Sequence, residues 1–203
     1  MPSLKVVLPI LTIGASASTL GGYIYSTSGQ KEVTILDKIK TSLNKNQRIL
    51  TSKGDSAWAK FKKVYKASGD KKVVGISEDQ INVWCESTLK SSFNKEKYEQ
   101  AMMWCVVYDR SIKESLSKPV LSAAKTDEKW KKAWDKFKAG NESAGELKLE
   151  DTSLKNFASD NRDTGGQSLS EWCTSKYEVK MYELGSETLS RKVEKWCGED
   201  AGK

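Results

Sequence analysis

Apolar residues recur every three or four positions through much of the chain after residue 30, which is the spacing of amphipathic helices. One apolar stripe consists of Ile81, Cys85, Leu89 and Phe93, and it follows the capping box Ser77-x-x-Gln80. A second stripe follows a predicted N-cap at Asn94 and ends before Pro119; it consists of Tyr98, Met102, Cys105 and Ile112. Together the two stripes predict a helical hairpin.

The same pattern predicts another hairpin near the C-terminus. Ser168-x-x-Glu171 has the form of a capping box, and the stripe after it consists of Leu169, Cys173, Tyr177, Met181 and Leu184. Gly185-Ser186 combines a C-terminal glycine with a new N-cap, and Leu189, Val193 and Cys197 mark the next helix.

A further amphipathic segment precedes each hairpin. After Asp55, one face carries Trp58, Phe61, Val64 and Tyr65. After a predicted cap at Thr126, the corresponding face carries Trp130, Ala133, Trp134 and Phe137. Aromatic residues at helical spacing are interpreted as core; a ligand-binding aromatic platform is the alternative.

All four cysteines follow a tryptophan, in the pairs Trp84-Cys85, Trp104-Cys105, Trp172-Cys173 and Trp196-Cys197. Two pairs come after Trp58-x-x-Phe61 and two after Trp134-x-x-Phe137, which predicts a tandem duplication. The predicted fold is therefore mainly α: two small, disulfide-stapled helical bundles after an N-terminal apolar segment.

The hairpins also predict which cysteines pair. In an antiparallel hairpin, residues equidistant from the turn face each other, and the two midpoints here are Lys95 and Gly185. Of the three pairings that four cysteines allow, this geometry selects Cys85–Cys105 and Cys173–Cys197.

Residues 1–25 form an apolar segment with a single charged residue, Lys5. A short apolar run followed by Ala15-Ser16-Ala17 is typical of a secretory signal peptide. The length from Val6 to Tyr25 equally fits an uncleaved membrane anchor, and the two interpretations remain open. Both predict an oxidising exterior, on the cell membrane's outer face or in secreted form, where an even number of cysteines forms disulfides.

Positive charge is concentrated in one part of the chain. The formal net charge is +7, and residues 31–75 hold twelve Lys or Arg against four acids. Val33, Leu36, Ile39, Leu43 and Leu50 predict a basic amphipathic helix within residues 26–50. Such a helix lies on anionic lipid or glycan, or packs on the first bundle with its lysines solvated. The candidate basic surface consists of Lys38, Lys40, Lys45, Arg48, Lys60, Lys62, Lys63, Lys66, Lys71 and Lys72.

The predicted organisation is residues 1–25 as signal or anchor, 26–50 as the membrane-proximal helix, 51–120 as the first repeat and 121–203 as the second. The second repeat has about twelve extra residues, including Asn161 to Gly166, which we interpret as a surface loop.

Few residues suggest catalysis. The chain has no histidine, its closest cysteines are too far apart for a typical zinc site, and it has no phosphate-binding glycine loop. We expect no catalytic residue, metal or cofactor, and no nucleic-acid partner, because arginine is scarce and no known binding motif is present. A hydrolase using carboxylates and tyrosines between the bundles is the remaining enzymatic alternative.

The chain resembles the uncharacterised paralogous families of haemotropic mycoplasmas. The resemblance is carried by the apolar N-terminal segment, the lysine-rich helices and the repeated Trp-Cys pairs, two of which follow each Trp-x-x-Phe. The resemblance implies an exported or membrane-anchored protein displayed to a host. We therefore expect an interaction protein that contacts its own membrane through the N-terminal segment and a host surface, anionic glycan or lipid through its basic face. A purely structural or antigenic surface protein has the same expected architecture.

Overall fold

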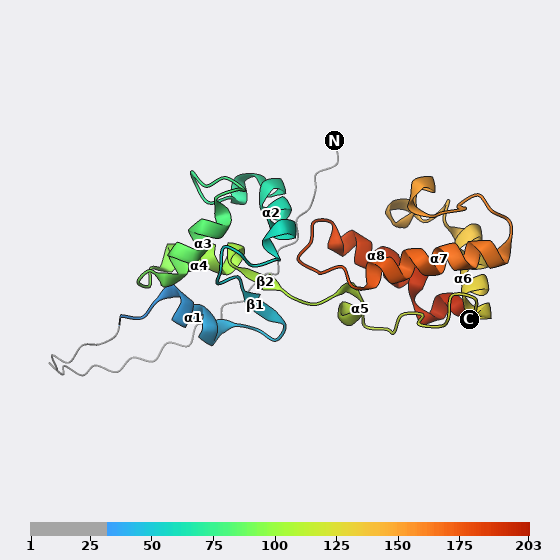
Figure 1. Cartoon of the computed structure of the whole chain (residues 1–203), viewed down its shortest axis with the longest axis horizontal. Helices are drawn as coiled ribbons and strands as arrows, with labels where there is room; N and C mark the ends of the chain where they lie inside the picture. Colours follow the sequence, from blue (N-terminus) through green and yellow to red (C-terminus); the bar gives the residue numbers. More distant parts are fainter. Residues whose placement is uncertain (1–31) are drawn as a thin grey trace.

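The computed structural model describes residues 32–203, so the predicted signal or anchor lies outside the described residues. Two helical lobes lie side by side and are joined by an extended link (Figure 1). Lobe 1 comprises residues 32–108 and lobe 2 residues 112–203. The fold is mainly helical, as predicted.

Lobe 1 has four helices and a short two-stranded sheet. The elements in order are α1 (Ile35–Ser42), β1 (Gln47–Ile49), α2 (Trp58–Ala67), the 3-10 turn η1 (Gly69–Lys71), α3 (Ile81–Lys90), α4 (Lys95–Trp104) and β2 (Val106–Tyr108). β1 and β2 are antiparallel, with Arg48 opposite Val107.

Lobe 2 is built from helices and 3-10 turns. Its elements in order are α5 (Ile112–Ser115), α6 (Glu128–Gly140), η2 (Gly145–Leu147), η3 (Asp151–Ser153), α7 (Arg162–Tyr177), α8 (Ser186–Cys197) and η4 (Glu199–Gly202). The predicted core faces of α2 and α6 are buried, which confirms that these Trp and Phe residues are core.

Each lobe has its own hydrophobic core. One core extends from Ile35 to Val107 and the other from Ile112 to Ala201. The division between the lobes therefore lies near residue 110, whereas the predicted boundary between the repeats is at residue 120. The first helix is likewise part of lobe 1, because Ile35 and Ile39 are fully buried in its core.

Two predicted helices are too long. The basic helix expected within residues 26–50 is α1 alone, since β1 follows it and Leu50 lies beyond the strand. The helix expected to run to about Leu116 ends at Trp104, where Cys105 begins the turn into β2. Both errors come from a missed strand. β1 and β2 have only three residues each, which is too short to show a periodicity of their own.

α7 begins earlier than predicted. Its N-cap is Asn161, whose side chain accepts the Thr164 N–H, so Ser168 is a buried residue within the helix. Gly165 and Gly166 were interpreted as a surface loop but are buried against α6. A Cβ on Gly165 would lie 2.1 Å from Trp134 Cε2. These glycines therefore allow α7 to approach α6 closely.

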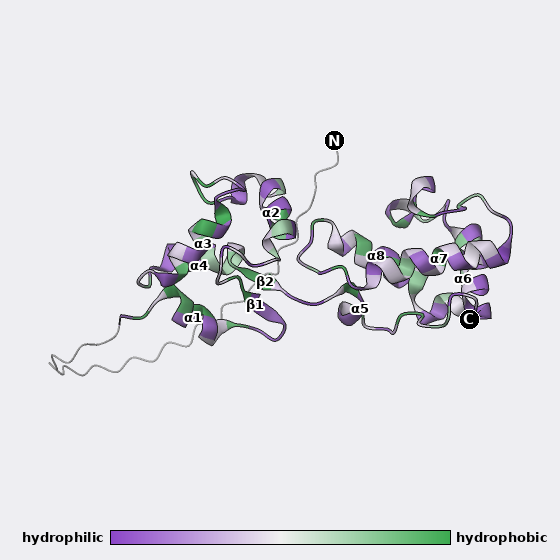
Figure 2. Cartoon of the chain, in the orientation of Figure 1, coloured by the Kyte–Doolittle hydropathy of each residue, from purple (hydrophilic) through white to green (hydrophobic). Residues whose placement is uncertain are grey.

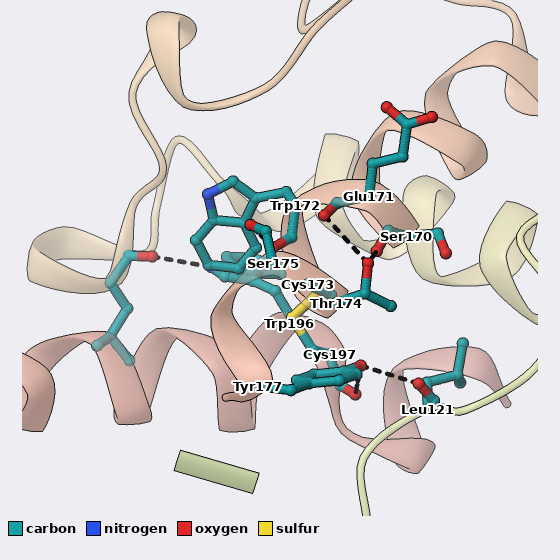
Figure 3. The surroundings of a disulfide bond; sticks show 11 residues. Leu121, Ser170, Glu171, Trp172, Cys173, Thr174, Ser175, Tyr177, Trp196 and Cys197 are labelled. Carbon is teal, nitrogen blue, oxygen red and sulfur yellow. Dashed lines mark hydrogen bonds between the residues drawn. A yellow bond between two sulfur atoms is a disulfide. The ribbon is translucent and has the colours of Figure 1, made fainter. Parts of the chain in front are cut away.

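Both predicted disulfides are present. Cys85 pairs with Cys105 and Cys173 with Cys197, so the pairing derived from the hairpin midpoints is confirmed. All four cysteines are fully buried. Trp172, Trp196 and Tyr177 surround the second disulfide (Figure 3), where the Tyr177 hydroxyl donates to the Leu121 carbonyl at 2.8 Å.

The two lobes repeat the same contacts at corresponding positions. Trp104 Nε1 donates to the Lys71 carbonyl at 3.0 Å, and Trp196 Nε1 donates to the Leu147 carbonyl at 2.8 Å. In each case the acceptor is the last residue of the 3-10 turn that follows the Trp-x-x-Phe helix.

A second shared contact clamps the chain after these turns. In lobe 1 the Val73 N–H donates to the Tyr65 hydroxyl at 3.1 Å. In lobe 2 the Leu149 N–H donates to Asn141 Oδ1 at 2.8 Å, and Asn141 Nδ2 donates to the Leu149 carbonyl at 3.0 Å. Tyr65 and Asn141 thus hold the residue eight positions further on by different chemistry.

The first helices of the lobes also correspond. The Ile35 N–H donates to the Ser91 carbonyl at 3.0 Å, and the Ile112 N–H donates to the Val179 carbonyl at 2.8 Å. Capping boxes precede both helices. These correspondences agree with a tandem duplication; descent from one ancestral unit stays a prediction.

The connection between α7 and α8 crosses to lobe 1. The Met181 N–H donates to the Arg110 carbonyl at 2.8 Å, which fixes this connection along the link between the lobes. Tyr182 packs edge-on against Phe61 of α2, with the ring centroids 6.3 Å apart. In lobe 2 the equivalent ring, Phe137, is covered edge-on at 5.6 Å by Phe157, which lies in the extra segment between η3 and α7.

Among residues 32–203, no helix combines the length and apolar character that a membrane crossing requires.

Candidate functional site

The ten predicted basic residues do not form one surface. Lys38 and Lys40 lie on α1 and Lys45 follows that helix, whereas Lys60, Lys62, Lys63 and Lys66 lie on α2. The two helices lie at different sides of lobe 1, with the sheet and the α3–α4 hairpin between them (Figure 1). Lys71 and Lys72 continue the α2 group into the following turn.

Arg48 belongs to a polar network at the lobe junction. Its guanidinium pairs with Asp55, and its Nε donates to Asp109 Oδ2 at 2.7 Å. Asp109 also pairs with Lys180 of lobe 2 at 3.2 Å. Arg48 therefore joins elements of the fold and is not part of an outward basic face.

The network lowers the pKa of both carboxyl groups. Partial burial alone would raise the pKa of Asp55, but the bonds from Arg48 and from the Ala57 N–H outweigh burial and lower it. The pKa of Asp109 is lowered in the same way, because bonds from Arg48 and Lys180 outweigh its burial. Both groups are therefore held as carboxylates.

This junction is where the alternative interpretation, a hydrolase that uses carboxylates and tyrosines, would have its site. Tyr182 lies there, and burial, followed by the negative charge of Asp109, raises the pKa of its hydroxyl. A glycosidase general acid needs a carboxyl group whose pKa is raised. The two carboxyl groups of the junction, Asp55 and Asp109, have lowered pKa values, which is the opposite of what a general acid needs.

The α2 lysines differ in what they contact. Lys60 pairs with Glu183 of lobe 2 at 3.2 Å, so it belongs to the junction. Lys66 pairs with Glu78 at 2.9 Å, and Lys62 donates to the Asp79 carbonyl at 3.1 Å. Lys63 and Lys71 are exposed. Five lysines at the surface of lobe 1 form what we call the basic face of α2. Three lie on the helix and two in the turn that follows it: Lys62, Lys63, Lys66, Lys71 and Lys72.

Exposed apolar side chains were not predicted, and most of them lie in lobe 1. Val74, next to this basic face, is 94% exposed. The other exposed large apolar residues of lobe 1 are Val33, Val83, Phe93, Met103 and Tyr108; among the described residues of lobe 2, only Leu184 qualifies. Figure 2 shows the hydrophobic stretch on the loop between α2 and α3.

Equivalent positions of lobe 2 carry charge. The residues before the Trp-Cys pairs are Val83 and Met103 in lobe 1, but Glu171 and Lys195 in lobe 2. The residue after the clamped Val73 is Val74, whereas Glu150 follows the clamped Leu149. The difference beside the Trp-Cys pairs can be seen by aligning the two halves of the sequence on those pairs. The difference between Val74 and Glu150 can be seen only once the structure shows which residues are clamped.

No protein-family model, curated protein or solved structure matches this chain.

Proposed function

We propose that this protein is a surface-displayed or secreted interaction protein that contacts its partner through the outer face of lobe 1. The observation that carries the proposal is the difference between the lobes at matched positions. Lobe 2 makes corresponding contacts, yet it has Glu150, Glu171 and Lys195 at the positions where lobe 1 exposes Val74, Val83 and Met103. The fold therefore does not require apolar residues at these positions, and we interpret their exposure in lobe 1 as serving a contact with a partner.

The charge distribution supports the same face. The basic face of α2 adjoins Val74, so attraction and apolar contact combine in one region. The two disulfides favour an oxidising location outside the cell, and residues 1–25 have the composition of an export signal or anchor. Partners consistent with this chemistry are the organism's own membrane, a host surface, or an anionic lipid or glycan.

Charge reversal tests the proposal. The variant Lys62→Glu/Lys63→Glu changes α2, and Lys129→Glu/Lys132→Glu makes the same change in net charge on α6. Retention of each purified chain on intact cells is measured at low and moderate salt. We expect the α2 variant to lose retention and the α6 variant to keep it. Equal losses would indicate attraction by net charge alone, and unchanged retention of both would contradict the proposed face.

The same assay addresses the alternative of a purely structural or antigenic surface protein. A protein without a partner would give no retention that depends on α2, whatever the salt concentration.

A further inference from the structure

The loop after η1 presents one apolar side chain on a fixed base. Val73 is buried, and its N–H is held by the Tyr65 hydroxyl, which itself donates to the Ile76 carbonyl at 2.9 Å. The Lys71 carbonyl is held by Trp104. Gly75 turns the chain with φ at +75°, a conformation that suits glycine. Val74 therefore projects from a loop that is anchored on both sides.

Charged groups flank this apolar tip. Lys71 is exposed beside it, and the Lys72 ammonium lies 5.9 Å from the centroid of the Tyr65 ring. Lys62, Lys63 and Lys66 extend the positive charge along α2. Three acids lie among these five lysines: Asp70 within the turn, Glu78 paired with Lys66, and Asp79 beside it. The region therefore keeps a net positive charge.

We propose that the loop Lys71–Gly75 contacts an anionic lipid bilayer, with Val74 inserted at the boundary between headgroups and acyl chains. This inference rests on the proposed function and names its partner. An aliphatic side chain surrounded by lysines matches a surface in which phosphates overlie hydrocarbon. The lysines alone could bind an anionic glycan through salt bridges, but a glycan offers no hydrocarbon layer into which Val74 could insert.

Lobe 2 provides the internal comparison. Its equivalent loop is held at the corresponding position by Asn141, yet Glu150 and Asp151 follow the clamped Leu149. An anionic surface repels these acids. The chain therefore directs lobe 1, and not lobe 2, toward the bilayer.

Site-specific labelling separates this contact from any contribution of residues 1–25. The full chain carrying Val74→Cys is labelled with an environment-sensitive fluorophore, and the matched control is the full chain carrying Glu150→Cys. Both are mixed with phosphatidylcholine vesicles, with or without phosphatidylglycerol, that contain nitroxide-labelled lipid. We expect a blue shift and quenching at position 74 only with phosphatidylglycerol, reversed by high salt, and no change at position 150.

A second variant avoids dependence on the label. Val74→Asp should bind vesicles that contain phosphatidylglycerol at least about tenfold more weakly than the parent protein does, because a charge replaces an apolar side chain that inserts into the bilayer. Equal signals at positions 74 and 150, or no signal at 74 on bound protein, would overturn the inference. If Val74→Asp leaves cell retention intact while the Lys62→Glu/Lys63→Glu variant abolishes it, the membrane contact is wrong and the proposed function stands.

Discussion

Replacing Asn141 with alanine should destabilise lobe 2 substantially. The Asn141 side chain is almost fully buried and forms two hydrogen bonds, of 2.8 and 3.0 Å, to the main chain of the buried residue Leu149. Alanine removes both bonds and leaves the Leu149 N–H and carbonyl without these partners. A buried polar group without its partner costs about 1–3 kcal/mol, so the loss for two groups is about 2–6 kcal/mol.

Urea unfolding followed by far-UV circular dichroism, with the disulfides intact, measures this loss. At an m-value of about 2 kcal/mol/M, the midpoint should fall by roughly 1–3 M. Glu142→Ala is the control, because Glu142 is the next residue but forms an exposed pair with Lys148; its loss should stay within about 1 kcal/mol. An Asn141→Ala midpoint equal to that of the parent would refute the role of the clamp.

Aspartate at the same position gives a sharper version of the test. A carboxylate accepts the Leu149 N–H but faces the Leu149 carbonyl with a second acceptor, whereas a protonated carboxyl group can donate to it. The folded state therefore raises the pKa of this aspartate, and its stabilising contribution is present at low pH and lost as pH rises through the raised pKa. Asn141→Asp should approach the parent near pH 4 and fall furthest below it at neutral pH.

Three further predictions concern packing, charge and the disulfides. Gly165→Ala should destabilise the protein by about 1–3 kcal/mol in thermal unfolding, because the added Cβ collides with Trp134; parental stability would show that α7 shifts freely. Asp109→Asn should lower the free energy of unfolding by about 1–3 kcal/mol at neutral pH. Because the folded state lowers the pKa of Asp109, the difference from the parent should shrink as pH falls below about 4. Urea unfolding at several pH values measures it, and a constant difference would contradict the prediction. Non-reducing peptide mapping should recover only links within a lobe, and reducing each disulfide should cost about 3 kcal/mol; a link between the lobes would contradict the pairing.

Local patterns predicted the features that depend on neighbouring residues in the sequence. The core faces of α2 and α6 follow from helical spacing, and the cysteine pairing follows from the hairpin midpoints. Features that depend on distant residues were missed. Gly165-Gly166 has the composition of a loop, and only its contact with α6 makes it the first turns of a buried helix.

The candidate site shows the same limit. The lysines of α2 were identified from composition, but Arg48 was placed with them because its partner Asp109 lies 61 residues away. Val74 was missed because an apolar residue in a sequence is expected to be buried. In the structure Val73 is buried, with its N–H bonded to the distant Tyr65 hydroxyl, and Val74 beside it is exposed.

The contact between Phe157 and Phe137 has a consequence for chain length. In a stack of repeats, each unit offers one surface to the next, and the last unit needs a different covering. Phe61 of lobe 1 receives Tyr182 of lobe 2, whereas the extra segment of lobe 2 places Phe157 over the corresponding surface. Phe157 therefore occupies the place on Phe137 that a residue equivalent to Tyr182 from another unit would take. A relative with three or more such units should therefore lack the extra segment in all but its last.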